Sequence, residues 1–355
     1  MIDIKQSRRP DQKVRTAVIG CGRIVRLAHL RVLLEHPGAE VVAVTDSDPA
    51  AREYVAAHAP SASFFGNMDS LLETARPEAV LIALPTSLHR EAALASIAAG
   101  AHTYLEKPIA PTSADATAIV DAWKQTGLIG RIGFNLRFSR LSSDMKSALS
   151  RGDIGDPVGV RTSWTARYPA ESGWRVSPRD GGGALLELAS HHIDLMRFLF
   201  DAEFDSVSAR TWSNRGDDEA AMLTLRMAND VNVQSFVSYG TVEEDRVEIY
   251  GTEGKLTVNR YDSLIVERTG PHATGGISSA KSRMLGELSA IRHGFTRRRA
   301  AGQEPSFSAS IGNFIDSVNS GVQSKPDLID GLRAIEVVEA AREAAREHST
   351  VKVAR

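Results

Sequence analysis

A lysine and a histidine stand in settings where each could act on a proton. Lys107 follows an apolar run and precedes Pro108, which disfavours helical geometry at the lysine. His191 lies in a helical pattern, four residues after Glu187 and three before Asp194, so the three share one helix face. A lysine amine can hydrogen-bond an alcohol or ketone oxygen, and a histidine flanked by carboxylates is poised to exchange a proton near neutral pH. These residue types predict proton transfer to or from a hydroxyl group.

A glycine-rich turn follows the first apolar run of the chain. In the stretch AVIGCGRIVRLAHL, Gly20 and Gly22 stand between that run and a helical pattern. Gly20 would permit a tight turn, and Gly22 would let the backbone approach a pyrophosphate at the N-terminus of the helix. Val25 occupies the position where this fingerprint usually has a third glycine or an alanine. The turn predicts a dinucleotide site, and the alternative is a purely structural turn between strand and helix.

An acid ends the second apolar run. Asp46 lies 26 residues after Gly20, near the position where a carboxylate accepts hydrogen bonds from the ribose hydroxyls of adenosine. A carboxylate repels the 2′-phosphate of NADP, and the next residue is Ser47 rather than an arginine that would bind this phosphate. We therefore expect NAD rather than NADP, the alternative being that Asp46 only ends the strand.

An alternating order of strands and helices must position these residues. Runs rich in Val, Ile and Leu predict strands buried on both faces, as in a parallel sheet covered by helices, and their βαβα order predicts a doubly wound α/β fold. The expected strands are 14–20, 40–46, 62–65, 79–84, 102–106 and 131–135, and the expected helices are 24–36, 50–58, 69–75, 89–99 and 113–126. In such a sheet, ligands bind outside the carboxyl ends of the strands, where the segments LPTSLH and EKP would lie.

The pattern changes after about residue 135. Longer β-rich segments joined by short turns predict an α+β domain with a mostly antiparallel sheet. The expected strands are 157–168, 203–213, 219–227, 230–240, 244–250 and 255–267, and the expected helices are 141–151, 184–200, 308–320 and 329–347. We predict an N-terminal tail over 1–12, a dinucleotide-binding domain over 13–134, and a substrate-binding and oligomerisation domain over 135–355.

Length and composition exclude several classes of protein. The chain of 355 residues is longer than one core usually supports, and its formal net charge of −2 favours neither nucleic acid nor an anionic membrane as a partner. Cys21 is the single cysteine, so no intramolecular disulfide can form. No apolar run is long enough to span a membrane, and no apolar stretch follows the N-terminal arginine pair as a secretory or twin-arginine signal would require. We expect a cytoplasmic enzyme.

Two other interpretations concern metals and anions. Glu187 and His191 could share a metal at their i, i+4 spacing, but the sequence suggests no third ligand, so no metal is expected. The basic stretch 292–302 is interpreted as a solvated helix end, with a patch for an anionic substrate or partner as the alternative.

The motifs together resemble the Gfo/Idh/MocA family, which includes glucose–fructose oxidoreductase and inositol dehydrogenase. The shared features are the G-x-G turn, LPTSLH, EKP and the glycine-led helix DGGGALLELASHHID. The resemblance implies an N-terminal Rossmann domain and a second domain with a large open sheet that commonly forms an oligomer interface. It also implies that Lys107 contacts the nicotinamide ribose and the reacting oxygen, and that His191 transfers the proton. Glu187 stands where the family usually has aspartate, and Ala189 where it often has glycine.

The candidate site residues follow from these motifs. The expected catalytic residues are Lys107, His191 and Glu187. The expected cofactor-binding residues are Gly20, Gly22, Arg23, Ile24, Asp46, Pro85, Thr86, His89, Glu106 and Lys107. The expected substrate contacts are Asn135, Arg137, Trp174, Arg175 and His192, each with a structural role as its alternative.

The predicted function is hydride transfer between NAD and a secondary alcohol of a sugar, a cyclitol or a sugar derivative by a homo-oligomer, a dimer or tetramer. Two enzymatic alternatives use a tightly held cofactor: dismutation between two sugars, and redox-assisted cleavage of a glycoside. A third alternative is an NAD-binding sensor without catalysis, which would need neither Lys107 nor the Glu187–His191 pair.

Overall fold

The computed structural model describes residues 12–167, 181–213, 218–271 and 304–354 of the chain. These residues form two compact units. The first comprises Met1–Asn135 and Ala300–Leu332, and the second comprises Leu136–Arg299 and Arg333–Arg355.

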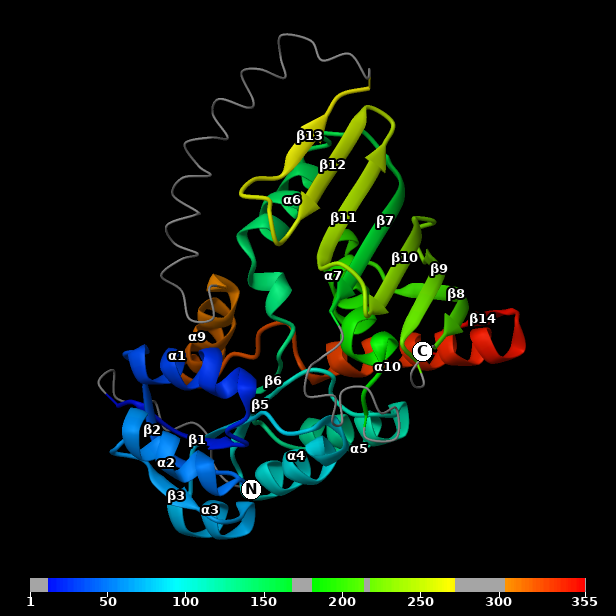
Figure 1. Cartoon of the computed structure of the whole chain (residues 1–355). Helices are drawn as coiled ribbons and strands as arrows, with labels where there is room; N and C mark the ends of the chain where they lie inside the picture. The colour runs from blue at the N-terminus through cyan, green and yellow to red at the C-terminus, as the bar shows by residue number, and fades with distance from the viewer. Residues whose placement is uncertain (1–11, 168–180, 214–217, 272–303, 355) are drawn as a thin grey trace. The chain divides into compact units, whose positions relative to one another are not determined.

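The first unit is built on a parallel sheet, drawn from blue to cyan in Figure 1. The strands lie in the order β3-β2-β1-β4-β5-β6. Its strands are β1 Val14–Ile19, β2 Ala39–Thr45, β3 Ser63–Phe65, β4 Ala79–Ile82, β5 His102–Leu105 and β6 Gly130–Ile132. Each adjacent pair is parallel. The order reverses direction between β1 and β4, which is the switch point of a doubly wound fold. The predicted fold class of this part is confirmed.

Helices cover this sheet on two sides. They are α1 Leu30–Glu35, α2 Pro49–His58, α3 Met68–Ala75, α4 His89–Ala98, α5 Ser113–Lys124 and α9 Pro305–Ser320. Apolar residues of α1, α2 and α9 share one hydrophobic cluster with β1. The helices α3, α4 and α5 contact one another in sequence to form the other layer. The predicted helix 24–36 begins with a π-helical turn, η1 Val25–His29, which the sequence pattern did not indicate.

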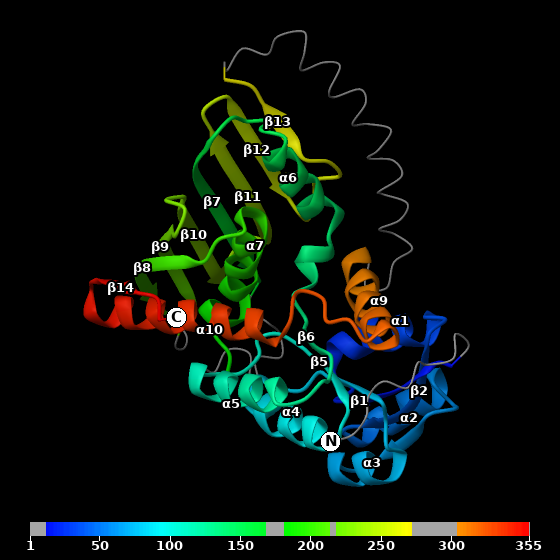
Figure 2. The ribbon, with the colours of Figure 1, turned by 180° about the vertical axis from the view of Figure 1, so that it is seen from behind.

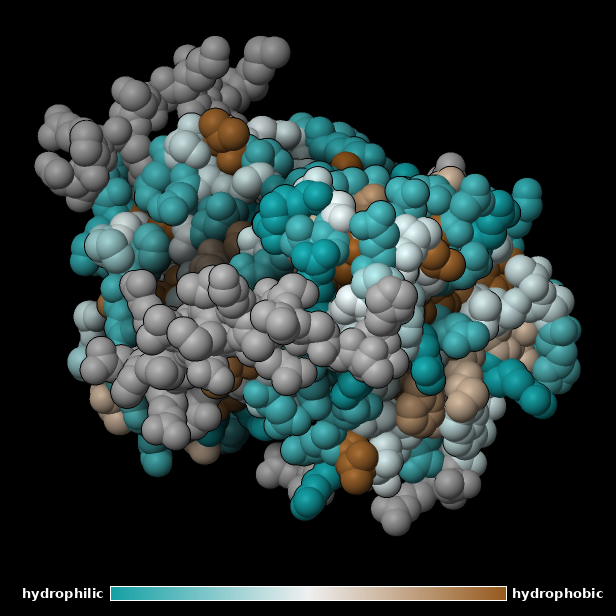
Figure 3. Space-filling model, turned by 90° about the horizontal axis from the view of Figure 1, so that it is seen from above, coloured by the Kyte–Doolittle hydropathy of each residue, from teal (hydrophilic) through white to brown (hydrophobic). Residues whose placement is uncertain are grey.

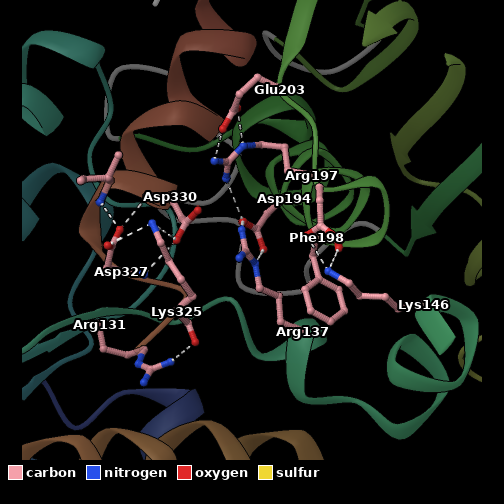
Figure 4. Close-up of polar contacts among 12 residues, drawn as sticks. Arg131, Arg137, Lys146, Asp194, Arg197, Phe198, Glu203, Lys325, Asp327 and Asp330 are labelled. Carbon is pink, nitrogen blue, oxygen red and sulfur yellow. Dashed lines mark hydrogen bonds and ion pairs between the residues drawn. The ribbon is translucent and has the colours of Figure 1, made fainter. Parts of the chain in front are cut away.

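The helix α9 belongs to the first unit although it is distant from it in sequence (Figure 2). It contacts β1, β5, α1 and η1. The segment after it is tied to β6, because the buried Arg131 donates a 2.7 Å hydrogen bond to the carbonyl oxygen of Lys325 (Figure 4). The predicted domain over 135–355 therefore differs from the compact units, since the described residues 304–332 belong to the first unit.

The second unit contains an eight-stranded sheet in the order β13-β12-β11-β7-β10-β9-β8-β14. Its strands are β7 Pro157–Ala166, β8 Phe204–Trp212, β9 Ala220–Met227, β10 Asn232–Tyr239, β11 Glu244–Gly251, β12 Gly254–Asn259, β13 Glu267–Thr269 and β14 Thr350–Lys352. Within this sheet, β7 and β10 are the only described neighbours that pair in parallel, and the other pairs are antiparallel. The mostly antiparallel sheet is confirmed, but the strand predicted over 255–267 is wrong: the chain turns after Asn259 and returns as β13.

The helices of this unit include α6 Arg140–Ser150 and α7 Ser190–Phe200, which pack against each other. A π-helical turn, η6 Leu185–Ala189, precedes α7 and contacts β7 and β10. A 3-10 turn, η3 Asn135–Phe138, begins at the last residue of the segment Met1–Asn135 and continues into the second unit. The long helix α10 Leu328–Glu347 includes residues of both units.

The surface seen in Figure 3 is mostly hydrophilic, with hydrophobic residues scattered over it. Large exposed hydrophobic side chains among the described residues are Leu27, Leu34, Leu88, Val158, Trp212, Met222, Val242, Tyr261 and Val322. None of the helices that the structure describes is long and apolar enough to cross a bilayer.

Candidate active site

The glycine turn joins β1 to η1 and α1. Gly20 has a φ of +91°, and a Cβ atom there would lie 2.4 Å from the carbonyl oxygen of Ala83, at the end of β4. Only glycine fits this approach. A Cβ atom at Gly22 would meet no heavy atom within 4 Å. The turn therefore packs tightly at Gly20 against the sheet and leaves open space at Gly22, as binding of a pyrophosphate requires.

Asp46 is bound to this turn. Its Oδ2 accepts a 2.5 Å hydrogen bond from the N–H of Cys21, and its Oδ1 accepts one of 2.7 Å from the N–H of Asp48. Burial raises the pKa of the Cys21 thiol, so the cysteine contributes its backbone here rather than a thiolate. The half-buried carboxylate of Asp46 thus lies beside the glycine turn.

We expect Asp46→Ala to weaken the preference for NAD by about tenfold or more, because the variant loses a group that would bind the ribose hydroxyls and repel a 2′-phosphate. The measurement is the dissociation constant of NADH and of NADPH, followed by cofactor fluorescence. Ser47→Ala, at the exposed neighbouring position, is the matched control and should keep the original ratio. An unchanged ratio in Asp46→Ala would remove this residue from the cofactor assignment.

The other residues expected near the turn differ in their surroundings. Arg23 is exposed and Ile24 is half-buried, both directly after the turn. Arg26, which was not predicted, is fixed to the turn: its Nε donates a 2.7 Å hydrogen bond to the carbonyl oxygen of Cys21, and its guanidinium lies 5.2 Å from the Tyr54 ring centroid. Contacts of Arg23 and Ile24 with the cofactor remain predictions.

The carboxyl end of β4 leads into Pro85 and the short 3-10 turn η2 Thr86–Leu88. Thr86 is fully buried, and its Oγ1 has no hydrogen-bond partner among the described residues. A buried hydroxyl without a partner is costly and is normally satisfied by a protein group, water or a ligand. Thr86 therefore fits a site in which a bound cofactor supplies the missing partner.

His89 links the ends of two strands. Its Nδ1 lies 2.8 Å from the carbonyl oxygen of Pro108, after β5, and its Nε2 lies 2.9 Å from that of Leu84, after β4. A neutral imidazole has only one N–H, so both contacts are hydrogen bonds only when the ring is protonated. The ring is buried. This position supports an action through the two backbone segments, while the predicted direct contact of His89 with the cofactor remains a prediction.

Lys107 directly follows the segment of β5 and Glu106, and the residue is half-buried. The preceding Glu106 accepts a 3.1 Å hydrogen bond at Oε2 from the Lys107 N–H. Its Oε1 lies 2.7 Å from Nε2 of His29, a fully buried histidine of η1. We did not predict a role for His29. Its spacing of four residues after the buried Val25 indicated an inward-facing position, where a histidine needs a polar partner.

In the second unit, His191 lies against an indole. Its ring centroid is 4.7 Å from that of Trp164 on β7, with a 38° tilt, and the residue is 8% exposed. The guanidinium of Arg260 is 5.2 Å from the Trp164 ring centroid. Glu187 is buried in η6, and its N–H donates to the carbonyl oxygen of Gly183. Both predicted catalytic residues of this unit are therefore held in packed surroundings at the start of α7.

Asp194 is bound by two arginines (Figure 4). Its carboxylate accepts hydrogen bonds of 2.8 Å from Nε and 2.6 Å from Nη2 of Arg137, and one of 3.4 Å from Arg197. Arg197 in turn makes two 2.7 Å hydrogen bonds with Glu203. The guanidinium of Arg137 is thus paired with a carboxylate buried in the protein. This geometry favours a structural role for Arg137, and its predicted contact with substrate remains a prediction.

His192 faces the sheet. Its Nε2 lies 3.0 Å from Oδ1 of Asp245 on β11, and both residues are buried. Burial alone would raise the pKa of Asp245, but Arg260 and His192 outweigh it and lower this pKa to about 2. Asp245 is therefore charged near neutral pH and holds His192 within the unit. This position does not support the predicted substrate contact of His192.

The remaining predicted substrate residues are in two situations. Asn135 is buried, and its Nδ2 donates a 2.8 Å hydrogen bond to Oγ of Ser306 on α9. Trp174 and Arg175 lie outside the described residues, as does the basic stretch 292–302. Within the described ranges, no group of three His, Cys, Asp or Glu side chains is arranged to hold a metal ion.

Two family models match the chain. One, described as an oxidoreductase family with an NAD-binding Rossmann fold, matches residues 14–134, and the GFO/IDH/MocA C-terminal domain matches residues 143–257. Together they span more than half of the sequence.

Similar proteins extend over nearly the whole chain. The inositol 2-dehydrogenase of Acidothermus cellulolyticus is 31% identical over 350 residues, covering 96% of this chain and 95% of that protein. The scyllo-inositol 2-dehydrogenase (NAD(+)) of Bacillus subtilis is 29% identical over 261 residues, which are 70% of this chain and 74% of that protein.

Solved structures share the fold. The WlbA dehydrogenase from Bordetella pertussis, in complex with NADH and UDP-GlcNAcA, has a TM-score of 0.84 at 23% identity and covers 98% of this chain and 100% of its own. The scyllo-inositol dehydrogenase from Lactobacillus casei, with NAD(H) and scyllo-inositol, has a TM-score of 0.78 at 18% identity, covering 97% and 100%.

Proposed function

The chain belongs to the Gfo/Idh/MocA family of oxidoreductases, and from this premise we propose that this NAD-dependent dehydrogenase of CH–OH groups acts on a secondary alcohol of a cyclitol or a related sugar. The observation that carries the proposal is the 31% identity to an inositol 2-dehydrogenase over 96% of the chain. The presence of Lys107, Glu187 and His191 supports it, because an alcohol oxidation needs a proton acceptor and a donor to the oxygen.

The first unit supplies the residues that would hold the cofactor. Gly22 leaves open space at the N-terminus of the helix, Asp46 presents a carboxylate beside the turn, and Thr86 offers a buried hydroxyl without a partner. When bound there, NAD supplies the hydride acceptor, which the side chains of the protein cannot provide. The chain's own contribution is binding, orientation and proton transfer.

His191 is proposed to accept the hydroxyl proton at Nε2, since its Nδ1 is buried. Glu187, one helical turn earlier, would stabilise the charged imidazole that results. The ammonium group of Lys107 would donate a hydrogen bond to the same substrate oxygen as negative charge develops on it. Lys107 belongs to the first compact unit and His191 to the second.

A substrate panel tests the proposal. The purified protein is mixed with NAD and with inositols, hexoses, aminosugars, uronic acids or nucleotide sugars, and reduced cofactor is followed by its absorbance. We expect an inositol or a closely related polyol to give the highest kcat/KM. NAD binding without turnover of any of these compounds would contradict the proposal and favour the sensor.

The same preparation separates the enzymatic alternatives. Cofactor that copurifies with the protein and does not exchange would favour sugar–sugar dismutation or redox-assisted glycoside cleavage. We also propose a cytoplasmic homo-oligomer. The second sheet supports this assembly because its strands carry exposed apolar side chains, Met222 at 57% and Trp212 at 42% exposure, the latter stacked on Phe236.

A further inference from the structure

His29 is a fully buried histidine in the first unit, nine residues after Gly20. Its ring makes edge contacts with two aromatic rings, at centroid distances of 6.2 Å to Tyr104 and 5.5 Å to Phe307. Its Nε2 lies 2.7 Å from Oε1 of Glu106. Its Nδ1 has no hydrogen-bond partner within the described part of the chain. The contact with Glu106 is therefore the one polar anchor of this ring that the described residues provide.

Glu106 is fixed from three sides. His29 binds one carboxylate oxygen, and the N–H of Lys107 donates to the other at 3.1 Å. On the third side the carboxyl group lies over Gly133, where an added Cβ would come within 2.9 Å of the carboxyl carbon. The orientation of this carboxylate is thus set by its surroundings, and through it the main chain of Lys107 is set as well.

The neighbouring tyrosine adds no competing charge. Tyr104 is fully buried, its hydroxyl lies 3.2 Å from Oγ of Ser310, and burial raises the pKa of its phenol far above the ordinary value. It remains neutral at all working pH values. The carboxylate of Glu106 is therefore the acceptor that His29 faces, and the two aromatic rings fix the plane in which the imidazole approaches it.

We propose that His29 is a positioning residue that acts through Glu106 on Lys107. The imidazole connects η1, which directly follows the glycine turn, to the segment that carries the lysine at the end of β5. The glycine turn and Lys107 are then held in fixed positions relative to each other, which the orientation of a reacting group requires. The inference rests on the proposed role of Lys107 in the reaction, and it adds a residue that makes no contact with substrate itself.

Loss of His29 would leave the Glu106 carboxylate with fewer donors in a largely buried position. The Glu106 side chain is only 12% exposed, so water would replace the lost imidazole poorly. The carboxylate would then have to turn toward solvent to regain hydrogen-bond donors. The backbone N–H of Lys107 would then lose its acceptor. Because small displacements of a reacting group lower rates steeply, we expect about a tenfold lower kcat in His29→Phe.

The first experiment compares His29→Phe with His29→Gln. The phenyl ring keeps the packing but removes the donor, whereas glutamine retains an N–H₂ group that can reach Glu106. We expect His29→Gln to recover most of the lost kcat, with KM for substrate nearly unchanged in both variants. His36→Gln, at the end of α1, is the control and should behave as wild type. Equal losses in both His29 variants would indicate packing alone and overturn the inference.

The second experiment is a double-mutant cycle with Lys107→Met. If His29 acts through Lys107, His29→Phe should lower kcat about tenfold in the wild-type background and less than twofold in the Lys107→Met background. Equal factors in the two backgrounds would overturn the link. If His29→Phe does not fold, as judged by circular dichroism, Glu106→Gln replaces it in the same cycle with the same expectation. Wild-type turnover in Lys107→Met alone would instead remove the proposed function of the lysine.

Discussion

His191→Ala should turn over the substrate about 10²–10⁴-fold more slowly than the wild type, because it lacks the group that accepts the hydroxyl proton. The residues expected to bind the cofactor lie in the first unit, so the dissociation constant of NADH should stay within about twofold. The measurement is kcat from reduced-cofactor absorbance on the substrate that the panel identifies. Added imidazole should restore part of the rate, because it supplies the missing base from solution.

The pH dependence provides a second readout for His191. A base must be neutral to accept a proton, so kcat/KM of the wild type should fall as the pH decreases through the pKa of the imidazole, and this acid limb should be absent in His191→Ala. His348→Asn is the matched control, since His348 is exposed and has a φ of +51° that asparagine tolerates. A variant that keeps both the rate and the acid limb would exclude His191 as the base.

Lys107→Met should lower kcat about 10²–10³-fold, the usual cost of removing one donor to an oxygen that becomes negative in the transition state. Methionine is unbranched like lysine, similar in length and uncharged, so the packing around this side chain should change little. Single-turnover measurements with a substrate deuterated at the reacting carbon should show a larger isotope effect, because hydride transfer becomes the slow step. Lys107→Arg should not restore the rate, since a planar guanidinium cannot replace a compact ammonium group.

Lys124→Met is the control for this loss of charge. Lys124 is the last residue of α5 in the same unit and is exposed, so its replacement should leave kcat and the isotope effect unchanged. A comparable rate loss in both variants would point to a general effect of charge. Wild-type kcat in Lys107→Met would exclude the amine from the reaction.

Most of the first unit could be predicted because its strands are buried on both faces. Ala79–Ile82 is a continuous apolar run, and Val14–Ile19 is apolar apart from Arg15 and Thr16. The helices between strands carry their own start signals, such as Asp48 before α2 and Thr112 before α5. The place of α9 could not be predicted, because an apolar stripe shows that a helix is buried but not which sheet buries it.

The two π-helical turns were also beyond sequence reasoning. Both η1 and η6 occur inside segments whose apolar spacing is typical of an α-helix. Each follows a glycine-containing turn and comes at or just before a histidine, His29 in one case and His191 in the other. A π-helical turn depends on tertiary packing around one extra residue per turn, and periodicity over a short window does not resolve it.

The sequence indicated which residues to consider for the candidate site, but it predicted their hydrogen-bond partners less well. The acid before the lysine was assigned to the cofactor, yet Glu106 is bound by His29, which drew no attention because a single buried histidine has no motif. Asp194 was assigned to the face of His191, and its carboxylate is held by Arg137 and Arg197. Spacing along one helix gives neighbours on that helix, whereas these partners come from distant segments.

The late position of α9 has a consequence for synthesis of the protein. The strand β6 ends at Ile132, but the helix that shares its hydrophobic cluster with β1 ends only at Ser320. At translation rates of about 5–20 residues per second, roughly 10–40 s separate the emergence of the two from the ribosome. During that interval α1 and α2 can already cover this side of the sheet, but the apolar residues that α9 buries stay exposed, and this is the period in which chaperones would be needed most.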